Sequence, residues 1–266
     1  MSVDIATLGR CVVWFSAGAA STVAAKLALV DRPDALICYI DTGSEHEDTP
    51  RYLADVSAWL GRPITVLRSS EYRDVDDVIE RARYISGPHG ARCTTELKKK
   101  VRRAFQHHDD IQVFGFHVGE VNPKRAEEFR EQNPEVNLWT PLLDRQLTKA
   151  DCHAIVERAG IRRHAMYELG YKNANCIGCV KGGMGYWNKI RVDFPDVFAR
   201  RARQERDIDH AICSVEVKIN GKRKKIPMFL DELDPDRGDY EAEEEVECGV
   251  LCAGAEASWA VENCDV

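Results

Sequence analysis

A long apolar stretch is missing from this sequence of 266 residues, since no run approaches the ~18 residues that a membrane-spanning helix needs. The first residues, MSVDIATLGR, lack the basic, apolar and small-residue regions of a secretory signal. Positive charge is also in deficit, because 37 lysines and arginines stand against 44 aspartates and glutamates. The formal net charge of −7 argues against a protein that binds polyanions over its whole surface. These absences predict a cytoplasmic protein with no membrane partner.

Cysteine, in contrast, is abundant, with ten residues. Because no secretory signal accompanies them, these thiols are better explained as metal ligands, cluster ligands or redox groups than as a disulfide framework. The chain length allows one large domain, or one domain with an added module. A hydrophobic content of 44% is sufficient to build a core.

The stretch from Cys11 to Val30, CVVWFSAGAASTVAAKLALV, organises the rest of the chain. It begins with a short apolar run typical of a buried parallel strand and ends with apolar residues at helical spacing. The small residues Ser16 to Thr22 lie between them. Gly18 can take a positive φ, and Ser21 or Thr22 can cap the helix. A tight turn before a helix N-terminus predicts an anion site, because free backbone N–H groups and the helix dipole point to the same place.

This loop lacks the Gly-Lys-Ser/Thr end of a Walker loop and the G-x-G-x-x-G dinucleotide fingerprint. Its pattern, Ser16-x-Gly18-x-x-Ser21, resembles the PP-loop of ATP pyrophosphatases and phosphoadenylyl-sulfate (PAPS) reductases. The pyrophosphatases usually carry Asp at the position of Ala20, so the resemblance favours the reductases. An ordinary tight turn is the alternative. The resemblance implies that an adenine nucleotide, either ATP or PAPS, binds at Ser16, Ala17, Gly18, Ser21 and Thr22.

Buried runs recur along the first part of the chain, separated by helical patterns. A strand–helix repeat of this kind predicts an α/β fold with a doubly wound parallel sheet of about five strands. Residues 1–170 are expected to form this nucleotide-binding domain, and residues 171–266 a C-terminal extension with a Cys-x-x-Cys pair, a helix, a hairpin and an acidic, cysteine-containing tail. The strands are expected to begin near Cys11, Ala35, Ile64, Ile111 and Leu138.

Three further segments extend the resemblance to PAPS reductases. Asp41-Thr42-Gly43 follows the second expected strand, and ligands of open α/β sheets lie beyond such strand ends. Glu120 and Arg125 follow the fourth strand, and an Arg is suited to a bidentate phosphate or sulfate contact. Lys98 lies in a basic helix. Helix capping and exposed loops are the alternative roles for these segments. The resemblance implies that the nucleotide also meets Asp41, Thr42, Gly43, Lys98, Glu120 and Arg125.

A glycine-rich segment after residue 170 contains Cys176-Ile-Gly-Cys179. Two thiolates at this spacing can bind one metal ion or one cluster iron, although redox pairs share the spacing. The pair resembles that of iron–sulfur PAPS reductases and of the DNA phosphorothioation sulfurtransferase. Cys93 resembles the family cysteine that precedes the basic helix. The iron–sulfur members carry two adjacent cysteines there, and Arg92 occupies one of those positions in this chain.

The sequence Glu-Cys-Gly around Cys248 resembles the PAPS reductase tail, in which this cysteine attacks the sulfur of the sulfonucleotide. Cys252 follows in a Cys-x-x-x-Cys pattern, which is also a spacing found between metal ligands. The resemblance implies that Cys248 is the catalytic nucleophile and that a [4Fe–4S] cluster binds to Cys93, Cys176, Cys179 and Cys252. A zinc site on Cys176, Cys179, Cys248 and Cys252 is the alternative.

The remaining patterns predict structural roles. Pro195 to Ile208 is expected to be a basic helix, residues 215–227 a hairpin with an Asn-Gly turn, and residues 231–247 a mobile, solvated acidic segment. Cys264 lies in the last residues and is expected to be mobile. Four other cysteines are expected to be buried and inert, namely Cys11, Cys38, Cys152 and Cys213.

Together these features indicate a PAPS reductase-like enzyme that performs thiol- or iron–sulfur-dependent reduction of a sulfonucleotide. Two alternatives stay open, an ATP-dependent sulfur transferase acting on nucleic acid or a small molecule, and a non-catalytic nucleotide-binding module with structural zinc. The expected partners are an adenine nucleotide and a thiol reductant or sulfur donor. A nucleic acid or protein acceptor and a homodimer are left open.

Overall fold

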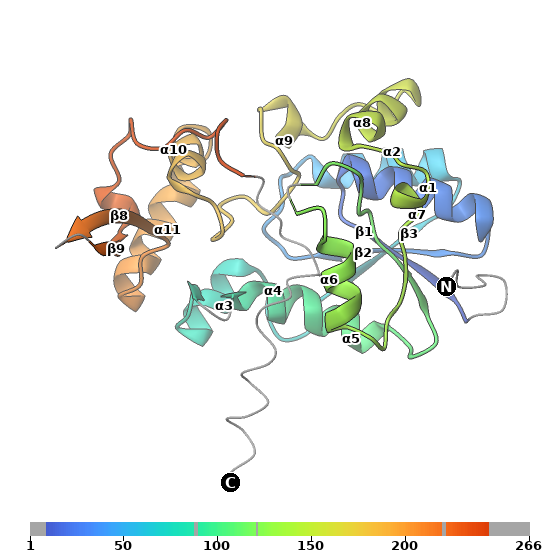
Figure 1. Ribbon diagram of the computed structural model, residues 1–266, viewed down its shortest axis with the longest axis horizontal. Helices are drawn as coiled ribbons and strands as arrows, with labels where there is room; N and C mark the ends of the chain where they lie inside the picture. The colour runs from blue at the N-terminus through green and yellow to red at the C-terminus, as the bar shows by residue number, and fades with distance from the viewer. Residues whose placement is uncertain (1–8, 88–89, 121, 220–221, 245–266) are drawn as a thin grey trace, which may run out of the picture. The chain divides into compact units, whose positions relative to one another are not determined.

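The computed structural model describes residues 9–87, 90–120, 122–219 and 222–244 (Figure 1). The chain divides into two compact units. The first unit comprises Met1–Asp41, Glu45–Ser69 and Lys99–Ala174, and the second comprises Thr42–Ser44, Ser70–Lys98 and Asn175–Val266. A division at residue 170 lies close to one of these boundaries, but it does not include the two early segments that belong to the second unit.

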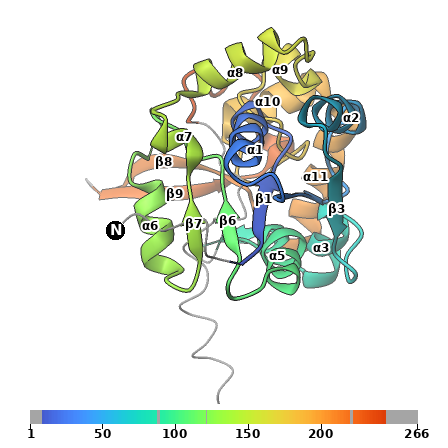
Figure 2. The same cartoon turned by 90° about the vertical axis from the view of Figure 1, so that its right-hand side faces the viewer.

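A five-stranded parallel sheet lies at the centre of the first unit (Figure 2). Its strands follow the order β3-β2-β1-β6-β7, and every neighbouring pair is parallel. The predicted α/β fold and its five parallel strands are therefore confirmed. The strand order reverses between β1 and β6, and the carboxyl ends of strands at such a point form the usual ligand site of open α/β sheets. The strands are β1 (Cys11–Phe15), β2 (Leu36–Asp41), β3 (Ile64–Arg68), β6 (Ile111–Val113) and β7 (Asn137–Trp139).

Strand β1 is buried on both faces, which explains its continuous apolar run. Val13 and Phe15 pack into the main core with α1 (Ala19–Asp31). Trp14, on the alternate face, contacts Phe105 of α5 (Lys100–Phe105) edge-on, with ring centroids 6.1 Å apart. Its indole N–H also donates a hydrogen bond of 3.1 Å to Gln112.

Local sequence signals set the ends of the other helices in the first unit. Thr148 and Asp151 form a capping box at the start of α8, as the Thr-x-x-Asp spacing allows. The expected strand after Leu138 ends at Trp139 because Pro141 has no N–H for the sheet and begins a helix instead. The helices are α2 (Thr49–Leu60), α6 (Arg125–Gln132), α7 (Pro141–Asp144), α8 (Lys149–Arg158) and α9 (Ala165–Glu168).

The second unit combines short helices with two small antiparallel ribbons. Helix α11 (Pro195–Ile208) has the predicted bounds, and the predicted hairpin forms β8 (Cys213–Ile219) and β9 (Lys222–Met228). Within the described ranges, no helix is both long and apolar enough to cross a membrane. The other elements are α3 (Val75–Ala82), β4 (Ser86–Gly87), β5 (Gly90–Ala91), α4 (Arg92–Thr94), the π-helical turn η1 (Thr95–Lys99), α10 (Met184–Asp193) and η2 (Leu230–Glu232).

The acidic segment is solvated as predicted over most of its described part, residues 231–244, but several of its residues also make contacts with the helices of the second unit. Leu233 is buried, and the Asp231 carboxylate lies 2.7 Å from the Arg206 guanidinium of α11. Glu243 accepts a hydrogen bond of 3.0 Å from the N–H of Tyr186 in the first turn of α10. These carboxylates neutralise a basic helix and satisfy a helix N-terminus, so the segment is part of the second unit's structure.

Glu205 of α11 holds the residue that precedes β8 and a residue that follows β9. Its fully buried carboxylate accepts hydrogen bonds from the N–H groups of Ile212 and Leu230, both at 2.6 Å. Burial raises the pKa of Glu205 to about 7, although these two hydrogen bonds act in the opposite direction. In the unfolded chain the pKa is the ordinary 4.5, so folding favours the protonated carboxyl.

The stability conferred by Glu205 should therefore be complete below pH 4.5 and be lost as the pH rises toward about 7. At about 1.4 kcal/mol per pKa unit, the loss amounts to about 3 kcal/mol. Urea unfolding of the wild type and Glu205→Gln at pH 5 and pH 8 should show the stability of the wild type falling relative to the variant. A difference that stays constant between these pH values would contradict this account.

Candidate nucleotide site and cysteine cluster

The loop between β1 and α1 is held in a closed ring by two serines. The Ser21 hydroxyl accepts a hydrogen bond from the backbone N–H of Ser16 at 3.1 Å and donates one to the carbonyl of Gly18 at 3.0 Å. The Ser16 hydroxyl lies 3.1 Å from the Ser21 hydroxyl oxygen, and Ser16 itself is exposed. The Ser-x-Gly-x-x-Ser spacing thus has a structural cause, because it places the second serine against the start of the loop.

The strained residue of the loop is Ala17 and not Gly18. Ala17 has a φ of 58°, whereas Gly18 has an extended φ of −97°. The expected positive φ is therefore displaced by one residue, and the loop stores strain of about 1 kcal/mol at an alanine. Gly18 leaves space instead: a Cβ there would lie 3.3 Å from the hydroxyl of Tyr167 and 3.7 Å from that of Ser16.

The first turn of α1 offers backbone N–H groups that no helical carbonyl can accept. Gly18 is the N-cap and supplies no side-chain hydrogen bond to them. Gly115, two residues after β6, lets this turn pack closely, because a Cβ there would lie 2.9 Å from the backbone nitrogen of Ser21. The sequence placed Gly115 within the expected fourth strand and gave it no role at the loop, because the approach of α1 is set only by folding. Free N–H groups at the positive end of a helix dipole can bind a phosphate.

Thr22 faces the protein interior and anchors the loop. Its side chain is fully buried, and its hydroxyl lies 2.9 Å from the Gly18 carbonyl and 3.0 Å from the Tyr52 hydroxyl. The ring of Tyr52 meets the imidazole of His164 edge-on at 5.6 Å. Thr22, one of the predicted nucleotide residues, therefore positions the loop through its contact with Tyr52 in the first unit.

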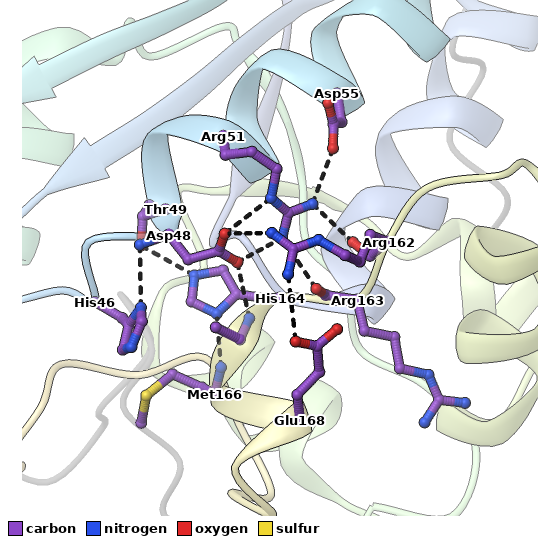
Figure 3. A network of polar contacts seen from close by, with 11 residues as sticks. His46, Asp48, Thr49, Arg51, Asp55, Arg162, Arg163, His164, Met166 and Glu168 are labelled. Atoms are coloured by element: carbon purple, nitrogen blue, oxygen red, sulfur yellow. Dashed lines mark hydrogen bonds and ion pairs between the residues drawn. The ribbon is translucent and has the colours of Figure 1, made fainter. Parts of the chain in front are cut away.

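His164 belongs to a polar network that joins α2 to the segment before α9 (Figure 3). Its Nδ1 accepts a hydrogen bond from the Met166 N–H at 3.2 Å, so Nε2 carries the proton and donates to the Thr49 hydroxyl at 3.0 Å. Asp48 accepts the N–H of Ala165 at 2.8 Å and pairs with Arg51 and Arg162. The hydrogen bond from Arg51 lowers the pKa of Asp48 to about 2.

The Asp41-Thr42-Gly43 signature is divided between the two units. Asp41 ends β2 and accepts a hydrogen bond of 2.9 Å from Arg68 on β3. Thr42 is buried, and its hydroxyl lies 3.0 Å from the sulfur of Cys176. Gly43 has a φ of +71°, and a Cβ there would lie 2.5 Å from the carbonyl oxygen of Arg73. Thr42 thus contacts the cysteine segment, and glycine is required at position 43 because of the approach of Arg73.

Glu120 and Arg125 form a pair after β6 in the first unit. The guanidinium of Arg125 lies 3.4 Å from the Glu120 carboxylate and 5.1 Å from the ring centroid of Phe116. Lys98 is half-buried within the π-helical turn η1 of the second unit. Glu120 and Arg125 therefore share the first unit with Ser16–Ser21, whereas Lys98 lies with the cysteines.

The Cys176-x-x-Cys179 loop is tightly bound within the second unit. The Tyr186 hydroxyl accepts a hydrogen bond of 2.9 Å from the N–H of Cys179, and the N–H of Ile177 donates one of 2.8 Å to the carbonyl of Ser44. Gly178 has a φ of +70°, and a Cβ there would lie 2.6 Å from a methyl group of Val197. Glycine between the two cysteines is therefore required for the turn, and both thiols are buried.

Cys93 shares the surroundings of this pair. It lies in the first turn of α4, which begins at Arg92 with Ala91 as its N-cap. It packs on the hydrophobic cluster that includes Cys176. Burial lowers the pKa of the Arg201 guanidinium, and the nearby Asp76 carboxylate, 3.2 Å away, acts in the opposite direction.

The donor set fits an iron–sulfur cluster in its chemistry, with three thiols in one apolar unit beside a buried cation. The sulfur atoms of these three cysteines do not lie as close together as the ligands of one zinc ion.

Within the described ranges, His107, Asp109 and Asp110 do form a group of potential metal ligands, whose atoms lie within 4.8 Å of one another. Asp110 in that group is already paired with Arg10 at 2.7 Å.

The remaining cysteines divide into two sets. Cys248, Cys252 and Cys264 lie outside the described residues, so the nucleophile and the fourth ligand stay predictions. The other four are buried as predicted, and burial raises the pKa of each thiol to about 12, which makes a reactive thiolate unfavourable. These are Cys11, Cys38, Cys152 and Cys213.

Comparison with known proteins agrees with this geometry. Residues 10–182, almost two thirds of the chain, match the phosphoadenosine phosphosulfate reductase domain. The chain belongs to this family. PAPS reductase domains form a family of nucleotide-binding enzymes related to sulfonucleotide chemistry, and the matched residues include the loop, the Asp-Thr-Gly segment and the Cys-x-x-Cys pair.

Two relatives extend the comparison. The crystal structure of PAPS reductase from Candida auris, a phosphate complex, gives a TM-score of 0.50 at 13% identity and covers 65% of this chain and 84% of that one. This likeness shows the shared fold. An uncharacterized 37.8 kDa protein in the gpa 5' region of Escherichia phage 186 is 26% identical over 162 residues, which are 57% of this chain. The match covers 45% of the phage protein, so this PAPS reductase domain chain spans less than half of that relative's length.

The buried imidazole of His164 makes the first unit sensitive to acid. Burial lowers the pKa of His164 from 6.5 to about 4, so the stability that its neutral form confers is present above pH 6.5 and is lost as the pH falls toward 4. At about 1.4 kcal/mol per pKa unit, the loss is up to about 3 kcal/mol. His164→Asn keeps an acceptor for the Met166 N–H but cannot titrate. Urea unfolding at pH 7 and pH 4.5 should show the wild type losing stability relative to this variant, and an equal loss in both proteins would contradict the assignment.

Proposed function

We propose that this chain binds an adenine nucleotide at the β1–α1 loop and performs thiol-dependent reduction of a sulfonucleotide. The observation that carries the proposal is the serine-closed ring at Ser16–Ser21, beside N–H groups of α1 that have no helical acceptor. Gly18 leaves room for a phosphate to reach these groups. Arg125, which follows the neighbouring strand β6, is proposed to supply positive charge to the nucleotide.

The reaction proposed for PAPS begins with the thiolate of Cys248. The thiolate attacks the sulfur of the sulfate group, the bond between that sulfur and the bridging phosphate oxygen breaks, and adenosine 3',5'-bisphosphate leaves with the electron pair. The enzyme then holds an S-sulfocysteine. A second thiol, from an external thiol reductant, attacks the cysteine sulfur, forms a disulfide and releases sulfite. The first step is favoured if the loop binds the charge of the leaving phosphate.

Cys93, Cys176, Cys179 and Cys252 are proposed as ligands of a [4Fe–4S] cluster, which would supply redox capacity in the second unit. Thr42 supports this assignment because its hydroxyl contacts the Cys176 sulfur, and hydrogen bonds to ligand sulfurs tune such sites. Arg201, whose buried guanidinium pairs with Asp76 at 3.2 Å, lies in the same unit as Cys93, Cys176 and Cys179.

ATP-dependent sulfur transfer is the second candidate. It would use the same loop, but the family members that cleave ATP carry Asp where this chain has Ala20. Binding therefore separates the two candidates: the reductase should prefer PAPS over ATP, and the transferase should bind ATP and release pyrophosphate.

Gly18→Val tests the loop directly. The extended backbone at Gly18 accepts valine, and its Cβ would meet the movable Tyr167 side chain at 3.3 Å, so the fold should persist while the phosphate is excluded. Calorimetric titration with PAPS and ATP should show binding weakened by at least about tenfold. Ala54→Val, on the exposed face of α2, is the matched control and should bind as the wild type does. Unchanged binding by a folded Gly18→Val would show that the nucleotide binds elsewhere.

Single cysteine replacements test which thiols bind the cluster and which one is the nucleophile. Cys176→Ser should lose iron, whereas Cys248→Ser should keep iron and lose sulfite formation. The measurements are iron and sulfide content, absorbance near ~400 nm after anaerobic purification, and turnover with PAPS. Cys152→Ala, at a buried thiol outside the cluster, should retain both iron and turnover. Loss of metal from Cys248→Ser with retention in Cys93→Ser would instead indicate a zinc site on the Cys-x-x-Cys pair and the tail.

A further inference from the structure

The second unit contains a cavity of about 440 Å³ that the proposed nucleotide loop does not border. Its walls come from the β4–β5 ribbon, from the chain just after Cys179, from the link between α11 and β8, and from β9. The volume lies in the range of pockets that hold one small molecule or one nucleotide unit. The cavity therefore has the size of a binding site and is built within one unit.

The charge of this cavity is opposite to that of the whole chain. None of its fourteen lining residues is acidic, whereas Lys181, Lys225 and His210 are basic. The chain as a whole has a formal net charge of −7. A cavity lined in this way can attract an anion although the average charge repels one.

The β8–β9 ribbon continues this positive charge away from the cavity. Its strands carry five basic residues and one acidic residue, Glu216, which lies 3.5 Å from Arg223. Lys222 to Pro227 are all exposed. Basic residues on an exposed strand also prevent aggregation, but that role does not require an acid-free cavity beside them. Strand and cavity together form a basic surface suited to a chain of phosphates.

An aromatic pair borders the same cavity. The ring of Tyr84 stacks on the imidazole of His210 with centroids 6.4 Å apart and an interplanar angle of 25°, and His210 lines the cavity. A Cβ at Gly182 would lie 1.9 Å from the Tyr186 ring, so glycine is required there, whereas one at Gly87 would lie 2.5 Å from the Tyr84 hydroxyl, which would have to move. Flat rings beside basic side chains are the combination that binds unstacked bases and their phosphates.

We infer that this cavity and the basic strand β9 bind single-stranded nucleic acid, with one base in the cavity against His210 and neighbouring phosphates along Lys222–Lys225. A duplex keeps its bases stacked and cannot place one in a cavity of this size. A single free phosphate would contact only one or two of the basic residues along β9. The surface is separate from the nucleotide loop, so its occupancy does not rest on the proposed function.

Fluorescence anisotropy with a labelled 20-nucleotide single strand at several salt concentrations tests the inference. Four phosphate contacts predict a slope of log K against log salt of about −3 for a single strand. Replacing Lys222, Lys224 and Lys225 by Gln should weaken binding at least about tenfold and reduce the slope by about 2. The control replaces Arg103, Arg158 and Arg163 by Gln, three exposed residues of the first unit, and should leave both quantities unchanged.

His210→Ala should weaken binding by about tenfold with an unchanged salt slope, as loss of one stacked base predicts. Gly18→Val should bind the strand as the wild type does, which separates this test from that of the nucleotide loop. Equal binding by the lysine variant and its control would overturn the inference. Preference for duplex, or binding only to inorganic phosphate or to vesicles containing phosphatidylserine, would also overturn it.

Discussion

The site depends on the unsatisfied backbone N–H groups at the start of α1. A buried helix end needs a hydrogen-bond partner, and Gly18 as N-cap provides none through a side chain. The closed ring of Ser16 and Ser21 fixes the loop around this end, Gly115 allows β6 to approach it, and Thr22 ties it to Tyr52. Each contact holds the loop while leaving the helix end open, and strain at Ala17 is the cost of that conformation. An anionic phosphate is the ligand that such an arrangement favours.

The second unit is organised around a different contact, the one between Thr42 and Cys176. The strand β2 ends in the first unit, and the next residue already supports a cysteine that lies 134 positions later in the chain. The same three-residue segment binds Ile177 through the Ser44 carbonyl and caps α3 through the Ser44 hydroxyl, which accepts the Val75 N–H at 3.1 Å. A motif that resembles a nucleotide signature therefore also serves as a structural link to the cysteine loop.

Sequence alone predicted the parts of the fold that depend on local patterns. Buried runs separated by helical patterns located the five parallel strands, and the bounds of α11 were predicted as well. Contacts between distant residues were not predictable in this way. Gly115 looks like part of the fourth strand, and His164, after two arginines, looks like part of an exposed loop. The contacts of the acidic segment with Arg206 and with the start of α10 were not predicted, because these partners become adjacent to it only on folding.

The open N–H groups after β1 are proposed to bind the phosphates of an adenine nucleotide. Backbone amide chemical shifts of the labelled protein, recorded during titration with PAPS, test it most directly. The account predicts that the largest saturable changes fall on residues 17–21 and on Gly115, which packs against them. Changes concentrated instead around residues 86–91 and 210–214, with the loop unaffected, would contradict it.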